Sequence, residues 1–216
     1  LNVPKILEVT LHNGVDPVSG RKVGLETGDP RGFGNYDELY AAFMKQIRYF
    51  VDMKVRVSNY IDRMFAKYAP ATFLSLFIDD CIAKGKDYYN CGPRYNTTYI
   101  QCTGLGTITD SLSALRKHVF EDKTFTMEAL LDAMADNFEG HEPMRQMILN
   151  RTPFFGNDDP YADQIAVRVF DDLYDAIEGK PNTKGECFHL NMLSTTCHVY
   201  FGKVMGATPN GRLAVR

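Results

Sequence analysis

The stretch 88–110 constrains the fold of this chain more than any other part of the sequence. Its first residues lack the 3.6-residue period of a helix, and Gly92 and Pro93 favour a turn. Residues 95–102 form a short run rich in β-branched and aromatic side chains, which predicts a strand.

A glycine turn and a helix are expected after this strand. Gly104 and Gly106 interrupt the strand pattern, and Thr107 or Thr109 can cap a helix that begins near Asp110. A strand that passes through a glycine turn into a helix is the building unit of α/β proteins. Because sites in that class gather at the carboxyl ends of strands, we expect a site near this end.

A second stretch near the end of the sequence shows a similar pattern. Residues 187–193 predict another short strand, and segment 194–202 leaves it as a loop or a short helix. Residues 208–211 predict a turn, with Gly211 at a position that needs a positive φ. The two strands are expected to belong to one larger sheet.

Helical periodicity dominates the remaining sequence, so the predicted fold class is α/β with a predominance of helix. Asn2 is the expected N-cap of a short first helix that ends at Asn13 and Gly14. The glycine- and proline-rich segment from there to Asn35 predicts a long surface loop. The further predicted helices are 37–68, 73–83, 110–119, 127–138, 143–149 and 160–178.

The longest of these helices, 37–68, carries apolar residues that recur mostly every three or four positions. At about 1.5 Å per residue it should be roughly 48 Å long. The apolar stripe favours packing against the rest of the protein. A coiled coil is the alternative, but the heptad pattern is not sustained.

Two adjacent carboxylates, Asp79 and Asp80, interrupt the apolar helix predicted over 73–83. Neighbouring positions on a helix point about 100° apart, so the pair is not a natural metal site. A buried salt bridge or a bond to the following loop is the expected role. Arg94 is expected to make structural bonds to loop carbonyls, with anion binding as the alternative.

Composition excludes several classes of protein. The net charge is −3, and 44% hydrophobic with 24% charged residues is ordinary for a globular domain. There is no basic surplus for nucleic acid, no apolar run of about 20 residues for a membrane span, and no signal peptide at the start. The five cysteines form no Cys-x-x-Cys pair, which favours reduced thiols in a cytoplasmic protein.

Six short motifs, in order over most of the chain, resemble the glycyl radical enzymes, a family that includes pyruvate formate-lyase. They are Gly92-Pro93-Arg94-Tyr95-Asn96, Thr109-Asp110-Ser111-Leu112-Ser113-Ala114, Gly156-Asn157-Asp158-Asp159, Pro181-Asn182-Thr183, Thr195-Thr196-Cys197-His198-Val199-Tyr200-Phe201-Gly202 and Thr208-Pro209-Asn210-Gly211-Arg212. The similarity is to the dehydratase and lyase branch. Segments 59–68 and 91–100 look most like the hydroxyproline dehydratases.

The resemblance implies a fold. Enzymes of this family form a ten-stranded α/β barrel of two parallel half-sheets, of which this chain would be a predominantly helical fragment. Their catalytic Cys lies in a Gly-Cys-x-Glu loop and their radical Gly in an Arg-Val-x-Gly-Tyr-like loop, and neither motif occurs here. Residues 1–216 are therefore expected to be part of a single pyruvate formate-lyase-like domain, truncated at both ends and inactive alone.

The resemblance also implies a reaction. A thiyl radical takes hydrogen from a small hydroxylated substrate, and water or an amine is expelled; dehydration of trans-4-hydroxy-L-proline is expected first. Choline trimethylamine-lyase and glycerol or propanediol dehydratase are the alternatives. A remnant domain that only associates with another chain is the non-enzymatic alternative.

No bound cofactor and no metal are expected in this chain. By resemblance, the glycyl radical of the parent enzyme is installed by an S-adenosylmethionine iron–sulfur activating enzyme. The implied partners are that activating enzyme, the remainder of the parent chain and a small-molecule substrate. The full-length enzyme is expected to be a homodimer.

Ser194, Thr195 and Thr196 are the predicted substrate-binding residues, whereas the resemblance implies no catalytic residue within the chain. The matching segment of the family lies at the end of a barrel strand beside the substrate. A hydroxyl there can bond a substrate carboxylate or hydroxyl. The alternative is a threonine that caps the following turn.

For three further residues a structural role is expected rather than a functional one. Gln101 and Cys102 end the first strand and are expected to pack in the core, with the barrel interior as the alternative. His198 is expected to be a hydrogen-bonded core histidine. Cys197 and His198 are adjacent, but neighbours in an extended segment face opposite ways, which argues against a catalytic dyad.

Overall fold

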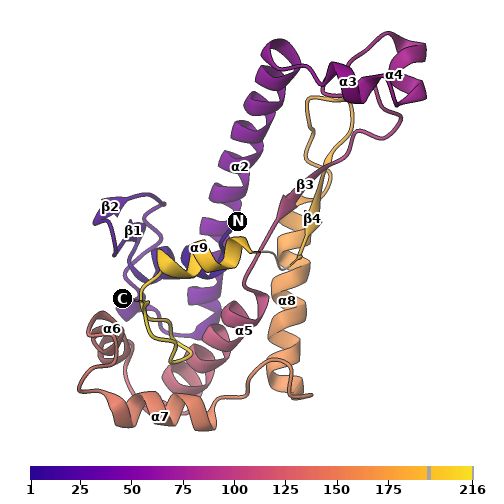
Figure 1. Cartoon of the computed structure of the whole chain (residues 1–216). Helices are drawn as coiled ribbons and strands as arrows, with labels where there is room; N and C mark the ends of the chain where they lie inside the picture. The colour runs from indigo at the N-terminus through magenta and orange to yellow at the C-terminus, as the bar shows by residue number, and fades with distance from the viewer. Residues whose placement is uncertain (194–195, 216) are drawn as a thin grey trace. The chain divides into compact units, whose positions relative to one another are not determined.

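The computed structural model describes residues 1–193 and 196–215 (Figure 1). The chain divides into two compact units. The first unit comprises Leu1–Tyr49, Cys102–Asp172 and Met192–Arg216, and the second comprises Phe50–Gln101 and Leu173–Asn191. The boundary falls within the two longest helices, α2 (Tyr36–Tyr68) and α8 (Pro160–Ile177).

The first unit is mainly helical. Its complete helical elements are α1 (Val3–Leu11), α5 (Leu105–Ala114), the π-helical segment η2 (Leu115–Glu121), α6 (Met127–Ala135), α7 (Glu142–Arg151) and α9 (Cys197–Lys203). The segment predicted as a surface loop contains a short hairpin, β1 (Val15–Asp16) with β2 (Arg21–Lys22), and the 3-10 turn η1 (Pro30–Gly32). The fully buried core side chains include Leu7, Phe43, Ile108, Leu112 and Val169.

Local capping signals account for several helix ends. The side chain of Asn2 accepts a hydrogen bond from the Lys5 amide, and α1 is followed by Asn13 and Gly14 with φ of 48° and 91°. Thr126 caps α6 by accepting from the amide of Ala129 at 3.1 Å. These predicted caps are confirmed.

The predicted start of the helix near Asp110 is wrong. Gly104 occupies the N-cap position of α5 with φ of 90°, so the helix begins at Leu105. A Cβ at position 104 would lie 2.5 Å from Cγ of Pro4, so only glycine fits between this turn and α1. Thr107 and Thr109 consequently lie inside α5 and do not cap it.

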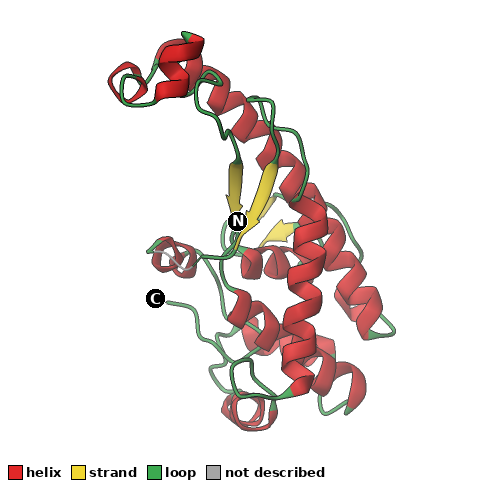
Figure 2. Ribbon diagram, turned by 90° about the vertical axis from the view of Figure 1, so that its right-hand side faces the viewer, coloured by secondary structure: helices red, strands yellow, loops and turns green. Residues whose placement is uncertain are grey.

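The second unit contains the short helices α3 (Thr72–Ser75) and α4 (Asp79–Lys84) and the strands β3 (Thr98–Gln101) and β4 (Phe188–Asn191). The strands, yellow in Figure 2, pair in parallel from Thr98↔Phe188 to Gln101↔Asn191. Both predicted strands are confirmed, although each is shorter than expected. Within the described ranges β3 and β4 form a two-stranded sheet, so the ten-stranded barrel remains a prediction.

The helix predicted over 73–83 is two helices. The hydroxyl of Ser75 donates to Asp87 at 2.9 Å and accepts from the Tyr88 amide at 2.9 Å, which ties the end of α3 to the following loop. Ile78 is extended, with φ of −118°, and α4 starts after it. Hydrogen bonds to a loop that follows α4 therefore interrupt a pattern that is locally helical.

The long helix α2 is continuous from Tyr36 to Tyr68, as predicted. In the first unit its side chains at Leu39, Phe43 and Ile47 are completely buried. In the part of α2 that belongs to the second unit, Tyr60 and Tyr68 are exposed. The apolar stripe of α2 is therefore not packed along its whole length.

Within 1–193 and 196–215 no helix is both long and apolar enough to cross a membrane. Over the same residues, no group of three His, Cys, Asp or Glu side chains is placed to hold a metal ion.

His118 is a buried titratable group in the first unit. It lies in η2, its Nε2 is 3.0 Å from Oγ1 of Thr152, and its ring stacks on Phe125 with centroids 5.4 Å apart. Burial, and secondarily the charge of Lys117, lower the pKa of His118 from its ordinary value of 6.5. The folded state therefore favours the neutral ring.

This pKa shift predicts a pH-dependent free energy of unfolding. The unfolded state binds more protons than the folded state below about pH 6.5, so stability should be constant above that pH and fall as the pH drops through the folded pKa. His118→Gln should flatten this slope in urea unfolding measured from pH 5 to 8. A slope in His118→Gln that equals that of the parent chain would contradict this role of His118.

Candidate functional site

The parallel pair β3–β4 gives the second unit one buried and one open face. Ile100 and Phe188 are fully buried on one face. Because side chains alternate along a strand, Tyr99 and His189 lie on the other face, where their rings are 5.8 Å apart. The carboxyl ends of both strands coincide, since the last pair in register is Gln101 with Asn191.

The predicted substrate-binding residues begin at Ser194, and two residues separate it from the end of β4 at Asn191. Ser194 and Thr195 lie outside the described residues. Thr196 is exposed and occupies the N-cap position of α9, with φ of −59° and ψ of −15°. Its side chain makes no capping hydrogen bond, so Thr196 does not have the capping role that was the alternative to substrate binding.

None of the residues of α9 is buried, and several polar contacts hold its carboxyl end. The side-chain amide nitrogen of Asn2 donates to the carbonyl of Phe201 at 3.4 Å, and Lys5 Nζ donates to the carbonyl of Val204 at 2.8 Å. Arg212 Nη2 donates to the carbonyl of Gly202 at 2.9 Å. Two cations thus lie where the helix dipole is negative and its carbonyls lack intrahelical partners.

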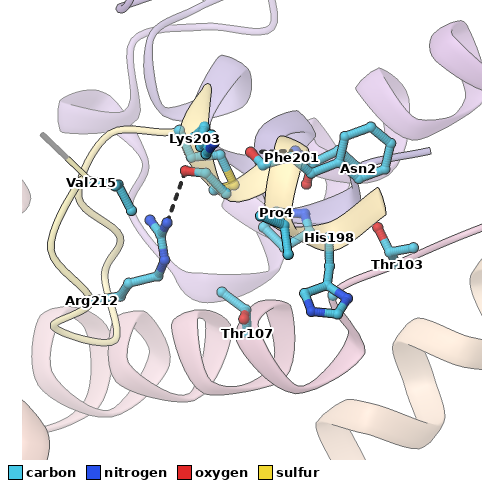
Figure 3. A pocket seen from close by; sticks show the side chains of 13 residues that line it. Asn2, Pro4, Thr103, Thr107, His198, Phe201, Lys203, Arg212 and Val215 are labelled. Carbon is cyan, nitrogen blue, oxygen red and sulfur yellow. Dashed lines mark hydrogen bonds between the residues drawn. The ribbon is translucent and has the colours of Figure 1, made fainter. Parts of the chain in front are cut away.

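A cavity of about 420 Å³ lies beside α9, within the size range of small-molecule sites. Figure 3 shows the ring of His198 projecting from α9 toward α5, which carries Thr107. The other polar side chains that line the cavity include Asn2, Thr103, Lys203 and Arg212. The charged side chains that line it are cationic, which favours an anionic group there.

The remaining sequence predictions have mixed outcomes. His198 is exposed, so its expected core position is wrong. Cys102 is buried, as expected, and burial raises the pKa of its thiol to about 11, which keeps it protonated at neutral pH. Gln101 is half-buried.

Arg94 has a structural role, as predicted, but its partner is the carboxylate of Asp80 and not the predicted loop carbonyls. Its Nε and Nη2 each lie 3.1 Å from a carboxylate oxygen of Asp80, in a bidentate pair that joins the loop to α4. The side-chain hydrogen bond to Arg94 lowers the pKa of Asp80, although burial opposes this. The predicted bond from the Asp79-Asp80 pair to the following loop is confirmed.

Asn182 is a structural residue that the sequence did not single out individually. Its amide nitrogen donates to the carbonyl of Asn96 at 2.6 Å and to Oγ1 of Thr98 at 3.1 Å. Its side-chain oxygen accepts from the amides of Lys184 and Glu186 at 2.8 and 3.0 Å. Two of the six motifs therefore meet at the start of β3.

Motif residues of the first unit meet in a comparable way. Asp110 accepts a hydrogen bond from the amide of Phe155 at 2.9 Å and another from the side chain of Asn210. Burial raises the pKa of Asp110 despite these bonds. Arg145 Nε donates to the carbonyl of Gly211 at 2.9 Å. These contacts join α5, α7 and the turn after α9.

The combination of a parallel strand pair, glycine turns and helices agrees with the predicted family. The family model described as pyruvate formate lyase-like matches residues 1–202. The chain belongs to the pyruvate formate lyase-like family, which confirms the family resemblance predicted from the motifs.

Individual relatives indicate which branch of the family the chain resembles. The chain is 50% identical over 216 residues to the trans-4-hydroxy-L-proline dehydratase of Clostridioides difficile, covering all of this chain and 27% of that enzyme. The crystal structure of the Clostridioides difficile hydroxyproline dehydratase with trans-4-hydroxy-L-proline bound matches 99% of this chain and 27% of that one, with a TM-score of 0.96. The glycerol-bound B12-independent glycerol dehydratase from Clostridium butyricum matches 99% of this chain and 27% of that one, at 32% identity and a TM-score of 0.93.

The four hydrogen bonds of Asn182 predict a measurable contribution to stability. Each net bond contributes about 0.5–1.5 kcal/mol, and unpaired partners add a cost, so Asn182→Ala should lower the free energy of unfolding by about 2 kcal/mol. Urea unfolding at pH 7 measures this.

Asn150→Ala is the matched control for this substitution. Asn150 is exposed on α7 and donates to the carbonyl of Gln146 at 2.7 Å, so its loss should cost less than about 0.5 kcal/mol. Equal effects of the two substitutions would contradict the role assigned to Asn182.

Proposed function

We propose that the protein carrying this chain is a glycyl radical dehydratase whose substrate is trans-4-hydroxy-L-proline. The observation that carries this proposal is the 50% identity along all 216 residues to the hydroxyproline dehydratase, against 32% to the glycerol dehydratase structure. The chain spans 27% of the length of that dehydratase, so the proposal concerns the whole protein.

The role proposed for this chain is to form part of the substrate pocket within an α/β barrel. The glycyl radical and its partner cysteine would supply hydrogen abstraction, but the family motifs that carry them are not among these 216 residues. The residues of this chain would bind and orient the substrate. No acid, base or radical group of the reaction is assigned to them.

The proposed contacts are the hydroxyls of residues 194–196, which follow the carboxyl end of β4. Ligands in α/β folds bind at such strand ends. A hydroxyl group there can donate to a substrate carboxylate and fix which carbon faces the reacting groups. The cationic side chains that line the cavity beside α9 support a substrate that carries a carboxylate over an uncharged diol.

A glycerol or propanediol dehydratase is the second candidate function. Its support is the TM-score of 0.93 to the glycerol dehydratase structure, which covers 99% of this chain. Choline cleavage and a remnant that only associates with another chain remain as further alternatives. One experiment can distinguish hydroxyproline dehydration, diol dehydration, choline cleavage and a non-enzymatic remnant.

The test is a chimera in which these 216 residues replace the matching segment of the Clostridioides difficile dehydratase. The chimera is activated anaerobically, its radical is measured by electron paramagnetic resonance, and turnover is measured with trans-4-hydroxy-L-proline, glycerol, propane-1,2-diol and choline. Dehydration of trans-4-hydroxy-L-proline should reach a kcat/KM within about tenfold of the host, a difference of about 1.4 kcal/mol or less.

Each other outcome of the chimera experiment has a defined meaning. A radical with turnover of a diol or of choline, but not of hydroxyproline, would support that alternative substrate. A radical with no turnover would support the remnant. A control chimera with the glycerol dehydratase segment shows whether the host accepts a foreign segment and acquires its radical.

Thr195→Val and Thr196→Val test the proposed contact in the same chimera. Valine keeps the shape and removes the hydroxyl. Loss of a hydrogen bond to a charged group costs about 1.5–3 kcal/mol, so at least one variant should lose about tenfold to a hundredfold in kcat/KM. Radical yield should not change in either variant.

Thr124→Val is the matched control, because Thr124 is exposed. It should leave kcat/KM within about twofold of the parent chimera. If Thr195→Val and Thr196→Val are equally silent, both threonines are structural and the pocket is formed by other residues.

A further inference from the structure

Three side chains of the second unit form a hydrogen-bonded row on and beside β4. Cys187 Sγ lies 3.5 Å from Nε2 of His189. The other ring nitrogen of His189, Nδ1, is hydrogen-bonded to a carboxylate oxygen of Glu178. The order of groups is therefore thiol, imidazole, carboxylate.

The strand geometry explains why these groups meet. Cys187 and His189 are two positions apart, so both point to the same side, while Phe188 between them is fully buried on the other side. Glu178 immediately follows α8, and its second carboxylate oxygen accepts from the amide of Leu190 at 3.2 Å. The ring of Tyr99 packs on His189 with centroids 5.8 Å apart.

These contacts assign the tautomer of His189. An ionised carboxylate only accepts hydrogen bonds, so the proton of the neutral ring must lie on Nδ1. Nε2 then presents its lone pair, and the Cys187 thiol donates to it. A carboxylate that orients an imidazole, which in turn accepts from a nucleophile, is the arrangement of base-activated nucleophiles.

The row is not a metal site. The thiol and the carboxylate bind opposite nitrogens of one imidazole ring, so no single ion can contact all three groups. The arrangement instead suits proton transfer along the row.

We propose that Cys187 is a nucleophilic thiol that reacts with small disulfides, with His189 as its base and Glu178 as the positioning residue of His189. In this step the Cys187 proton moves to Nε2 of His189, and Sγ attacks one sulfur of the disulfide. A mixed disulfide forms, the original S–S bond breaks, and the leaving thiolate takes the proton from His189. One disulfide and one thiol give one mixed disulfide and one thiol.

Exposure separates Cys187 from the buried cysteines. Cys187 is half-buried and the His189 side chain is 31% exposed, so a small disulfide can reach the row. Cys81 and Cys102 are buried, and burial raises the pKa of Cys102 to about 11. Cys91 is half-buried like Cys187 and belongs to the same unit, which makes it the internal comparator.

The test is to treat the purified full chain with glutathione disulfide at pH 7.5 and, in parallel, with iodoacetamide. Mass spectrometry of peptides gives the modification rate at each cysteine. Cys187 should react at least about tenfold faster than Cys91, because a positioned base contributes about a hundredfold or more where it is fully effective. His189→Gln should abolish this advantage, and Glu178→Gln should reduce it about threefold to tenfold.

The rate at Cys91 controls for the fold and should be the same in all variants. In guanidinium chloride the ratio of the Cys187 rate to the Cys91 rate should approach one. If His189→Gln unfolds the chain, the proposal is tested by the Cys187 rate in Glu178→Gln and by the comparison of the folded with the denatured chain. A Cys187 rate no higher than that of Cys91 in the folded chain, or a Cys187 rate unaffected by both substitutions, would overturn the proposal. Both readouts are independent of dehydratase activity.

Discussion

The parallel pairing of β3 with β4 is the contact on which the candidate site depends. A two-stranded sheet of four residues per strand is marginal in water without further support. The support comes from complete burial of Ile100 and Phe188 and from the bonds of Asn182, which join the segments that lead into the two strands. The register they set brings the two carboxyl ends together, and segment 194–196 follows one of them in the sequence.

Much of the fold could be predicted because its signals are local. The caps at Asn2 and Thr126 depend on residues within one turn, and the period of α2 extends over its whole length. The errors arose where a distant residue decides the local structure. Gly104 starts α5 because Pro4 leaves no room for a Cβ, and Ser75 ends α3 because it bonds a loop that follows α4.

The site was less predictable because residues distant in sequence decide its local structure too. The motifs identified the family, but several of their residues, among them Arg94, Asp110 and Asn182, form hydrogen bonds between segments of the fold. His198 was expected in the core, yet α9 is held by contacts to its terminal carbonyls and leaves that ring exposed beside a cavity. The row of Cys187, His189 and Glu178 had no sequence signal, because Glu178 reaches β4 only through the packing of the end of α8.

The most direct test of the account is the crystal structure of the activatable chimera with trans-4-hydroxy-L-proline bound, determined without oxygen. Substrate should lie beside the carboxyl ends of β3 and β4, with a side-chain oxygen of residues 194–196 within about 3.5 Å of a substrate oxygen. Substrate bound with every side-chain oxygen of those residues more than about 5 Å away, beyond hydrogen-bond range, would contradict it.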